Sequence, residues 1–214
     1  MRLFDYTASA NCLKVRILAA QLGLDLERVP IDIFAAETLT DDYLARNPAG
    51  ETPVLELDSG AHLAESNAIL LYLAEGSPLL PDDLEERAQV WRWLFFEQSA
   101  VVPSIGSARF WILTGRDAGR EDELDRRLGS VRSVLSLLDE HLCGNAYLVA
   151  GRYTLADLAV YGYTHVAPDA GIDLDDFPQV RRWLAAVEAQ PGFVNDLVTY
   201  PQNARPGAGA SIYG

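Results

Sequence analysis

The feature that most restricts the fold of this chain is a break marked by two closely spaced prolines, where the hydrophobic pattern changes. Pro78 and Pro81 interrupt any helix, because a proline lacks the N–H donor and its ring clashes with the preceding turn. Before the break, short apolar runs alternate with helical patterns, and after it the pattern is helical almost throughout. The 214 residues therefore predict two domains of different class, at 1–75 and 84–200, joined by a linker at 76–83.

The pattern of the first 75 residues predicts an α/β domain. Two apolar runs flank Asp58-Ser59-Gly60, and these residue types favour the tight turn of a hairpin. Apolar residues recur at helical spacing between the first two strands, and Gly23 follows them as a helix stop. The expected elements are strands at 2–4, 26–33, 54–57 and 61–63, and helices at 12–22, at 41–46 and from Ser66 onward. This order predicts a small mixed sheet with helices on its faces.

The pattern after the linker predicts an all-helical bundle, followed by an extended or mobile tail at 201–214. Apolar residues recur every three or four positions along one long helix: Leu124, Leu128, Val131, Leu135, Leu138 and Leu142. In another helix, Val90, Trp91, Leu94 and Phe95 form an apolar face, and Trp93 and Phe96 lie on other faces. Such a helix is expected to be buried on several sides and so can also meet a partner subunit. The tail holds two prolines and three glycines, which disfavour regular structure.

Composition excludes several classes of function. The 17 Lys and Arg against 31 Asp and Glu give a net charge of −14, which argues against nucleic acid or an anionic membrane as partner, since both require cationic surface. The longest wholly apolar run, Ala68–Ala74, is too short to span a membrane. Two cysteines are too few for a disulfide framework, and three scattered histidines lack metal-ligand spacing. With no signal-peptide pattern at the start, we expect a cytoplasmic protein without a metal site.

The junction between the first strand and the first helix carries Ser9 and Asn11. At a helix start the backbone N–H groups lack partners and the helix dipole is positive, so this position stabilises an anion, including a thiolate brought by a ligand. Either side chain also serves as a plain helix cap, because Ser and Asn are among the preferred capping residues. The residues alone leave both interpretations open.

Two further segments combine turn residues with groups that can bind a peptide. A cis bond between Thr52 and Pro53 would turn the Thr52 N–H and C=O outward to pair with an extended peptide, although an ordinary strand-entry proline fits equally. Glu65 and Ser66 start a helix, where Ser66 is expected to act in part as a cap. The same pair can hold a zwitterionic amino acid, since free N–H groups bind a carboxylate and Glu65 accepts from an ammonium.

Four motifs occur here in the order and spacing of one protein family. They are Ser9-x-Asn11, Asn47-Pro48-x-Gly50-x-Thr52-Pro53, Glu65-Ser66-x-Ala68-Ile69 and Gly151-x-x-Thr154-x-x-Asp157. Over essentially its whole length the chain resembles a cytosolic glutathione S-transferase of the bacterial type with serine and asparagine in the active site. The resemblance implies a thioredoxin-like N-terminal domain and an all-helical C-terminal domain that carries the electrophile pocket. The last motif also fits a capping box in which Asp157 replaces the usual glutamate.

The resemblance implies that glutathione is the co-substrate and that Ser9 and Asn11 are catalytic residues that activate its thiol. A free thiol has a pKa of about 8.5, and lowering this pKa by about two pH units requires about 2.7 kcal/mol of preferential stabilisation of the thiolate. One hydrogen bond from a hydroxyl to a charged acceptor supplies about 1.5–3 kcal/mol, so Ser9 suffices as a donor without being a nucleophile. The implied glutathione-binding residues are Ser9, Asn11, Thr38, Thr52, Pro53, Glu65 and Ser66.

Each part of glutathione has a matching position in this resemblance. The Thr52 backbone would pair with the cysteinyl part, and Glu65 with Ser66 would hold the γ-glutamyl end. Thr38 would contact the glycyl end. Leu39 stands where several relatives carry a basic residue for the glycyl carboxylate. Another cation therefore compensates for it, or glutathione affinity is lower than usual.

Three neighbouring residues bear on these expectations. Lys14 and Arg46 are the cations available to take over from a basic residue at position 39. Cys12 stands three residues after Ser9, which is the spacing of the thioredoxin dithiol motif with the first cysteine replaced. An internal dithiol cycle is thus not available, and we expect Cys12 to be buried against the sheet.

Three functions fit these residues, and the leading one is transfer of glutathione to an electrophilic, apolar small molecule. The alternative activity is glutathione-dependent disulfide reduction, because Ser9-x-Asn11 and the run from Glu65 to Ala74 resemble a bacterial branch with that activity. A non-catalytic glutathione- or ligand-binding protein with this fold is the third, although both thiol-activating residues are present. The resemblance also implies a homodimer, consistent with the Trp- and Phe-rich helix after residue 84.

Overall fold

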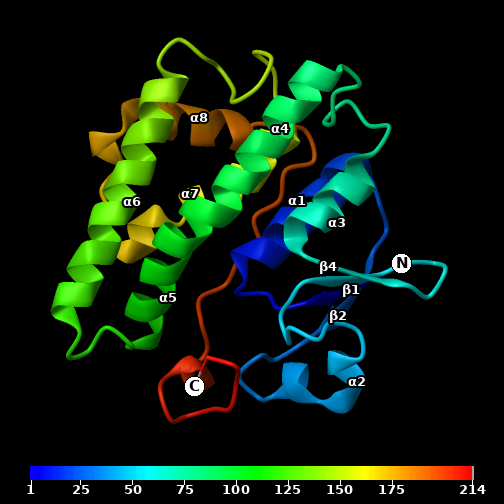
Figure 1. Cartoon of the computed structure of the whole chain (residues 1–214), viewed down its shortest axis with the longest axis vertical. Coiled ribbons are helices and arrows are strands. Elements are labelled where there is room, and N and C mark those ends of the chain that lie inside the picture. Colours follow the sequence, from blue (N-terminus) through cyan, green and yellow to red (C-terminus); the bar gives the residue numbers. More distant parts are fainter. Residues whose placement is uncertain (214) are drawn as a thin grey trace. The chain divides into compact units, whose positions relative to one another are not determined.

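The computed structural model describes residues 1–213, and within them the chain divides into two compact units. The first unit comprises Met1–Leu73 together with the residues from Val194 onward, and the second comprises Ala74–Phe193. The strands lie in the first unit, and the second is helical (Figure 1). The fold class is the predicted one, an α/β thioredoxin-like domain and an all-helical domain.

The first unit is built on a mixed sheet, in which the described strands have the order β2-β1-β3-β4. Its elements are β1 (Arg2–Asp5), α1 (Ala10–Leu22), β2 (Glu27–Pro30), η1 (Glu37–Leu39), α2 (Asp41–Leu44), β3 (Val54–Glu56), β4 (His62–Ala64), α3 (Ser66–Ala74) and, near the C-terminus, η5 (Gln202–Ala204). Strand β1 runs parallel to β2 and antiparallel to β3, which pairs antiparallel with β4. The predicted order of strands, hairpin and helices is confirmed.

Local sequence explains where α1 lies and how the sheet is covered. The helix begins at Ala10 because the Ser9 side chain accepts a hydrogen bond from the Cys12 N–H, and it ends at Gly23, which has the left-handed φ of +64° that favours glycine. Phe4 of β1 packs with Tyr43 of α2 in a buried cluster on one face of the sheet.

Strand β2 ends at Pro30, three residues before the predicted boundary at residue 33. The chain then turns, because the Asp32 carboxylate accepts a hydrogen bond from the Phe34 N–H at 2.8 Å. Aspartate favours such turns, so the apolar residue at position 31 did not extend the strand.

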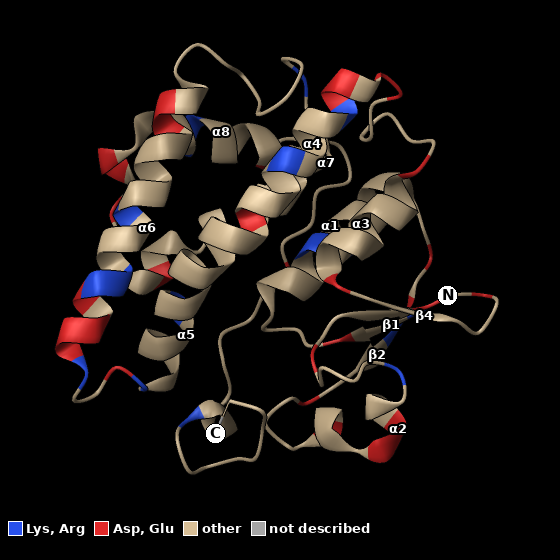
Figure 2. Cartoon of the chain, in the orientation of Figure 1, with Lys and Arg blue, Asp and Glu red and all other residues tan. Residues whose placement is uncertain are grey.

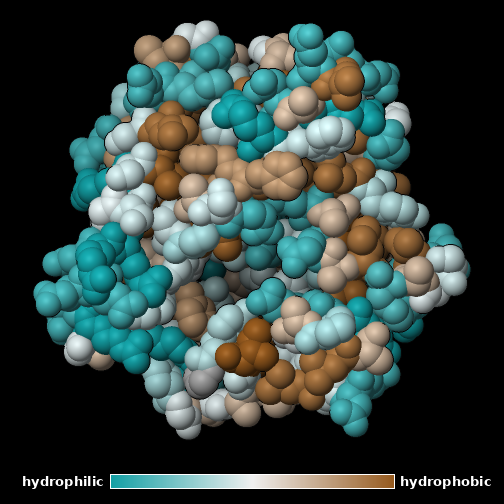
Figure 3. Space-filling view, in the orientation of Figure 1, coloured by the Kyte–Doolittle hydropathy of each residue, from teal (hydrophilic) through white to brown (hydrophobic). Residues whose placement is uncertain are grey.

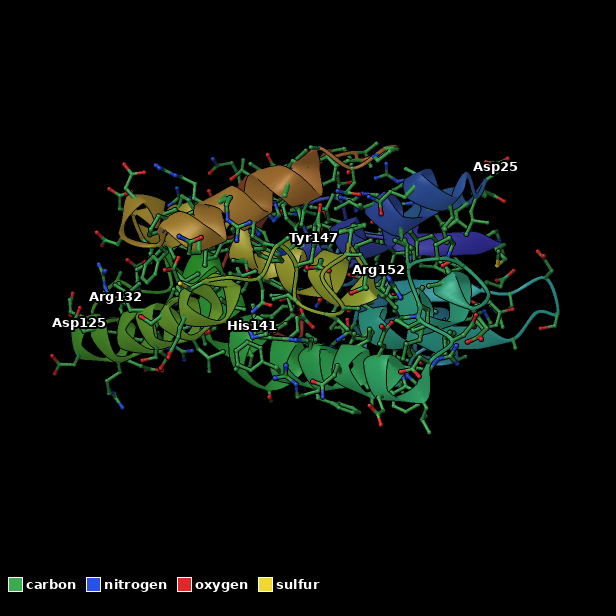
Figure 4. The ribbon with its side chains drawn as sticks, turned by 90° about the horizontal axis from the view of Figure 1, so that it is seen from above. Asp25, Asp125, Arg132, His141, Tyr147 and Arg152 are labelled. Carbon is green, nitrogen blue, oxygen red and sulfur yellow. The ribbon has the colours of Figure 1, made fainter. Side chains whose placement is uncertain are left out.

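The second unit consists of helices joined by short turns. Its elements are α4 (Leu84–Phe96), the π-helical η2 (Glu97–Gly106), α5 (Ser107–Thr114), α6 (Glu121–Leu142), α7 (Leu155–Thr164), η3 (Ala167–Ala170), η4 (Leu174–Asp176) and α8 (Pro178–Glu188). Helix α6 starts with acidic residues, red in Figure 2, which favour the positive end of a helix dipole. Asp125, Arg132 and His141 follow one another along α6 (Figure 4). The predicted stripe of α6 is fully buried from Val131 to Leu142 and half-buried at Leu124 and Leu128.

A continuous helical stretch from α4 through η2 to α5 packs against α7. Gly106 lies where this stretch meets Tyr163, and a Cβ at position 106 would stand 2.7 Å from the Tyr163 ring. Glycine is therefore required for the close packing of these helices.

The sequence predicted that α4 is buried on several sides, but part of its apolar surface is exposed. Val90, Trp93 and Leu94 are buried, whereas Trp91 is 38% and Phe95 73% exposed. Hydrophobic side chains at the surface are visible on the face that carries α4 (Figure 3). The predicted apolar face thus divides into a buried part and an exposed part.

The residues from Val194 onward belong to the first unit, whereas the predicted helical domain extended over 84–200 and the predicted tail over 201–214. Ion pairs hold these residues, called the C-terminal return, against the first unit. The Asp196 carboxylate pairs with Arg16 at 2.6 Å and with Arg28 at 2.8 Å, and both arginines also pair with the buried Asp5. Pairings so distant in sequence leave no local pattern, so the periodicity of the chain did not predict them.

Candidate functional site

The start of helix α1 carries the first predicted site residue, Ser9. The Ser9 hydroxyl oxygen accepts a hydrogen bond from the Cys12 N–H at 3.3 Å, so Ser9 is indeed the N-cap of α1. Because the hydroxyl is the acceptor in that bond, it can donate its own hydrogen either to the Cys12 thiol or to a ligand. A half-buried hydroxyl therefore lies at the positive end of a 13-residue helix, where an anion is stabilised.

Asn11 connects this helix start to the start of α3. The Asn11 side-chain oxygen accepts a hydrogen bond from the Ser66 hydroxyl at 3.2 Å. Its amide nitrogen has no hydrogen-bond partner among residues 1–213 and remains available as a donor. One turn further, the buried Lys14 donates to the Asn67 side-chain oxygen at 3.3 Å. Two hydrogen bonds thus hold the beginnings of α1 and α3 side by side.

The bond between Thr52 and Pro53 is cis, as the sequence allowed. Neither the N–H nor the C=O of Thr52 has a hydrogen-bond partner within the described residues. The Thr52 hydroxyl hydrogen-bonds the Cys12 thiol, which places Thr52 beside the start of α1. A half-buried backbone with open donor and acceptor positions can pair with an extended peptide.

Glu65 has a backbone conformation that is rare outside glycine. Its φ is +68°, its side chain is exposed, and its C=O accepts the first hydrogen bond of α3 from the Ile69 N–H. Such left-handed non-glycine residues gather at functional sites, because the surrounding structure must hold them there. The buried Ser66 follows directly.

A second carboxylate lies near Glu65. Burial, together with the neighbouring Glu65 charge, raises the pKa of Glu51. Two acidic side chains therefore face the same region, one on each side of the cis-proline loop in the sequence. This arrangement favours a cationic ligand group, such as an ammonium.

Cys12 is fully buried at the centre of these residues, as predicted. Burial, with the Asp5 charge adding to it, raises the pKa of the Cys12 thiol to about 11. Hydrogen bonds from the Tyr6 N–H and from the Ser9 and Thr52 hydroxyls only partly oppose this effect. A thiol with this pKa is protonated at neutral pH and is therefore a poor nucleophile.

Thr38 lies at the far end of the site, in η1. Its side chain is fully buried, and its hydroxyl has no hydrogen-bond partner in the described part of the chain. A Cβ on Gly50, whose φ is +66°, would stand 3.3 Å from the Thr38 C=O and 3.6 Å from Leu39. The loop before the cis proline therefore packs directly on η1.

The two cations considered as substitutes at this end are engaged elsewhere. Lys14 is buried against Asn67. Arg46 pairs with Asp42 at 2.5 Å, and its guanidinium lies 4.9 Å from the centre of the Phe4 ring. Neither arrangement supplies a cation beside Leu39.

An open pocket of about 430 Å³ lies next to this site in the first unit. It is lined by Asp5–Ala8, Pro30–Asp32, Glu37 and three residues of the C-terminal return, Val198, Thr199 and Pro201. The pocket includes none of the predicted site residues. Its acidic lining and its lack of Ser9, Thr52 and Ser66 separate it from the cluster described above.

Sequence reasoning missed the residues that the C-terminal return brings to the site. Tyr200 and Tyr213 form ring contacts with Phe34, and Ile212 lies close to Gly50. Ile212 and Tyr213 are large side chains within a predicted tail otherwise rich in small residues, and Tyr200 directly precedes that tail, which is the local signal that could have pointed to them.

Two kinds of feature are absent from residues 1–213, a group of metal-ligating side chains and a membrane-spanning helix. No group of three or more His, Cys, Asp and Glu side chains is arranged to hold a metal ion in this part of the chain. No helix there is both long and apolar enough to cross a membrane.

Two family models match different parts of the chain and together cover more than half of its length. The model described as "Glutathione S-transferase, N-terminal domain" matches residues 1–75, and "Glutathione S-transferase, C-terminal domain" matches residues 100–191. The first match contains every predicted site residue, from Ser9 to Ser66.

Solved structures of related proteins agree with this match. The structure of a possible glutathione S-transferase from Rhodopseudomonas palustris is 43% identical, covers 93% of this chain and 90% of its own, and gives a TM-score of 0.88. A glutathione S-transferase from Pseudomonas fluorescens is 39% identical, with coverage of 92% and 98% and a TM-score of 0.89. Ure2p in complex with glutathione is 28% identical, with coverage of 89% and 95% and a TM-score of 0.81. The chain therefore belongs to the glutathione S-transferase family of enzymes.

Proposed function

We propose that the first unit binds glutathione with its sulfur at the start of α1, and that the enzyme transfers glutathione to a small, apolar electrophile. The observation that carries this proposal is the position of the Ser9 hydroxyl at a helix N-terminus, where it accepts from the Cys12 N–H and can donate its own hydrogen to a ligand. A thiolate placed there gains one hydrogen bond to a charged acceptor, about 1.5–3 kcal/mol, together with the helix dipole.

Asn11 is the second donor to the thiolate. Its amide nitrogen is available because the Asn11 oxygen is already bonded to the Ser66 hydroxyl. Two donors at one sulfur lower the thiol pKa further than one, since both favour the charged form. Cys12 takes no part, because its buried thiol stays protonated.

The remaining parts of glutathione fit the groups around this sulfur position. The open N–H and C=O of Thr52 pair with the cysteinyl backbone, next to Pro53. Glu65 accepts from the γ-glutamyl ammonium, while Ser66 at the start of α3 binds the γ-glutamyl carboxylate. The buried Thr38 hydroxyl, which lacks a partner within the described residues, faces the glycyl end.

The chemical step is a nucleophilic substitution or addition. In a substitution, the glutathione sulfur forms a bond to the electrophilic carbon, and a leaving group such as chloride departs with the electron pair of the broken bond. In an addition, the sulfur forms the same bond, and the electron pair of the substrate double bond moves to the neighbouring atom, which takes up a proton. The enzyme contributes a higher thiolate fraction at neutral pH and a fixed position for the sulfur.

Glutathione-dependent disulfide reduction is the second candidate, because the same thiolate can attack sulfur. One glutathione forms a mixed disulfide and releases a thiolate, and a second glutathione completes the exchange. The protonated Cys12 favours this two-glutathione route over an internal dithiol. A non-catalytic role is the third candidate, because the chain is also similar to a structure described as the nitrogen regulation fragment of the yeast prion protein Ure2p.

Turnover of two substrates separates these candidates. We expect the protein to conjugate chlorodinitrobenzene faster than it reduces hydroxyethyl disulfide, each measured with glutathione. Consumption of the disulfide alone would favour the reductase, and turnover of neither would favour the binding protein. Ser9→Ala and Asn11→Ala, singly and together, then identify the main activator.

The matched control for these variants is Asp83→Ala. Asp83 caps α4 by accepting from the Glu86 N–H at 2.9 Å, as Ser9 caps α1, but it lies in the second unit. Both changes remove a cap worth about 1 kcal/mol of stability. Only the changes at Ser9 and Asn11 should lower turnover, and an equal loss in Asp83→Ala would attribute the effect to folding.

We further propose a homodimer and a cytoplasmic site of action. The exposed Leu84, Trp91 and Phe95 lie on one side of α4 at spacings of seven and four, which suits a second copy of this surface. Phe95→Glu should convert the dimer to a monomer in light scattering, and an unchanged mass would exclude this surface. Both cysteines are free thiols, which suits a reducing compartment.

A further inference from the structure

Lys14 is a fully buried cation in helix α1, one turn after Asn11. Lysine side chains are rarely buried, because removing an ammonium from water costs free energy that other interactions must offset. The Lys14 ammonium donates a hydrogen bond to the Asn67 side-chain oxygen at 3.3 Å, across 53 positions of the sequence. This positive charge thus lies beside the start of α3, and the thiolate chemistry of Ser9 and Asn11 does not use it.

Helices α1 and α3 lie side by side (Figure 1), and α1 holds two consecutive residues of α3. The Ser66 hydroxyl donates to the Asn11 side-chain oxygen at 3.2 Å, and the Asn67 side chain accepts from Lys14. Ser66 and Asn67 are 3% and 8% exposed, so both contacts lie inside the first unit. Because Asn11 and Lys14 are three positions apart, they lie on the same face of α1. The Lys14 ammonium is thereby fixed next to the residue that follows Ser66.

The start of α3 is suited to an anion that comes from a ligand. The Ser66 N–H has no hydrogen-bond partner within the described residues. The first turn of α3 contains no acidic side chain, whereas the first turns of α4, α6 and α7 do. The positive end of the α3 dipole is therefore not neutralised by side chains of its own first turn, and a ligand carboxylate is stabilised there.

A positive charge lies beneath this helix start and a negative charge lies at its surface. The first is the buried Lys14 ammonium, and the second is the carboxylate of the exposed Glu65. The γ-glutamyl end of glutathione carries a carboxylate and an ammonium on one carbon, which matches this pair of charges. Water and salt screen a buried charge less than a surface charge, so the field of Lys14 adds to the α3 dipole at the ligand carboxylate.

We propose that Lys14 is a positioning residue that makes the site select thiols with a free γ-glutamyl carboxylate. It acts through the start of α3, because its bond to Asn67 fixes the first turn and its charge stabilises the carboxylate that Ser66 binds. This inference rests on the proposed function and adds to it both a residue and a selectivity.

Calorimetric titration of Lys14→Met with three thiols tests this proposal. The thiols are glutathione, glutaryl-cysteinylglycine, which lacks only the ammonium, and γ-aminobutyryl-cysteinylglycine, which lacks only the carboxylate. Methionine has nearly the length of lysine and no charge. The change should weaken binding of the two thiols that keep the carboxylate about tenfold, or about 1.4 kcal/mol, and binding of the third less than about twofold.

Two further variants separate the charge of Lys14 from its hydrogen bond. Lys14→Gln keeps a donor for Asn67 without the charge, so it should behave as Lys14→Met does, whereas Lys14→Arg keeps the charge and should recover most of the glutathione affinity. The matched control is Arg2→Met. Arg2 is a cation of the same unit that pairs with Glu56 at 2.6 Å, at the other end of β1 from the loop that carries Ser9. Its loss changes the net charge equally and should leave all three affinities unchanged.

Equal weakening of all three thiols in Lys14→Met would mean that Lys14 only holds α1 against α3, and this would overturn the proposal, as would an unchanged affinity for glutathione. The unaltered protein offers a test that needs no variant, because it should bind γ-aminobutyryl-cysteinylglycine at least about tenfold more weakly than glutathione. Equal affinities for these two thiols would also overturn the proposal. If the unaltered protein binds none of the three thiols, the proposed function itself fails.

Discussion

Replacing Asp157 by asparagine should remove a pH dependence from the stability of the second unit. Asp157 is fully buried at the start of α7, where it completes the predicted capping box with Thr154. Its two carboxylate oxygens accept from the N–H groups of Leu148, Thr154 and Trp183, at 2.9 Å each, and from the Thr154 hydroxyl at 3.1 Å. Burial nevertheless outweighs these bonds and raises the pKa of Asp157 to about 6.

The magnitude follows from linkage between protonation and folding. The ordinary pKa is 3.8, and the folded value is about 6. Between these values the folded chain binds more protons than the unfolded chain, so stability falls as the pH rises through this window. The full effect is about 3 kcal/mol, and about 2 kcal/mol of it is lost between pH 4 and 7, because a tenfold change in proton affinity corresponds to about 1.4 kcal/mol.

Denaturant unfolding of both proteins at several pH values provides the assay. All four tryptophans lie in the second unit, so their fluorescence follows that unit alone. The difference in unfolding free energy between the unaltered protein and Asp157→Asn removes the contributions of other carboxylates. A difference that stays constant or grows in favour of the unaltered protein from pH 4 to 7 would mean that the four hydrogen bonds outweigh burial, and would refute the reasoning.

Three further outcomes follow from buried groups elsewhere. A maleimide should label only the exposed Cys143 in the folded chain, because Cys12 is buried with a pKa of about 11, and rapid labelling of both thiols would contradict this burial. Arg16→Met should cost about 3 kcal/mol of stability by circular dichroism, because it strips the buried Asp5 of a partner at 2.6 Å, and a cost below about 1 kcal/mol would mean that this pair is not needed. Thr154→Ala should cost about 1 kcal/mol and leave glutathione turnover intact, so a folded but inactive variant would give the capping box a catalytic part.

The parts of the site that follow from local chemistry could be predicted from the sequence. Capping and turn preferences predict where three site residues lie: Ser9 before a helix, Pro53 before a strand and Ser66 after a hairpin. These preferences act over a few residues, and the same few residues build the helix starts and the cis bond. The predicted burial of Cys12 is also confirmed, since nearly all of α1 from Ala10 to Ala19 is buried.

The parts that depend on distant contacts could not be predicted in this way. Asn11 and Ser66 meet through a hydrogen bond across 55 positions, and Asp196 pairs with Arg16 across 180. The C-terminal residues Asn203–Tyr213 are the clearest example. Their glycines read as a sign of mobility, whereas Gly209 is required because two carbonyl oxygens leave no room for a side chain. Glycine content indicates how freely the backbone can bend, but it does not show which distant atoms the backbone packs against.

The central claim is that the start of α1 stabilises the thiolate of bound glutathione, and a spectroscopic titration of that thiolate tests it most directly. The ultraviolet absorbance of the thiolate would be followed against pH with glutathione bound to the unaltered protein, to the double variant Ser9→Ala, Asn11→Ala and to the control Asp83→Ala. We expect the pKa of the bound glutathione thiol to lie at least about one pH unit below the free value of about 8.5 in the unaltered protein and in the control. In the double variant this pKa should return toward about 8.5. A bound thiol that titrates near 8.5 in the unaltered protein would contradict the account.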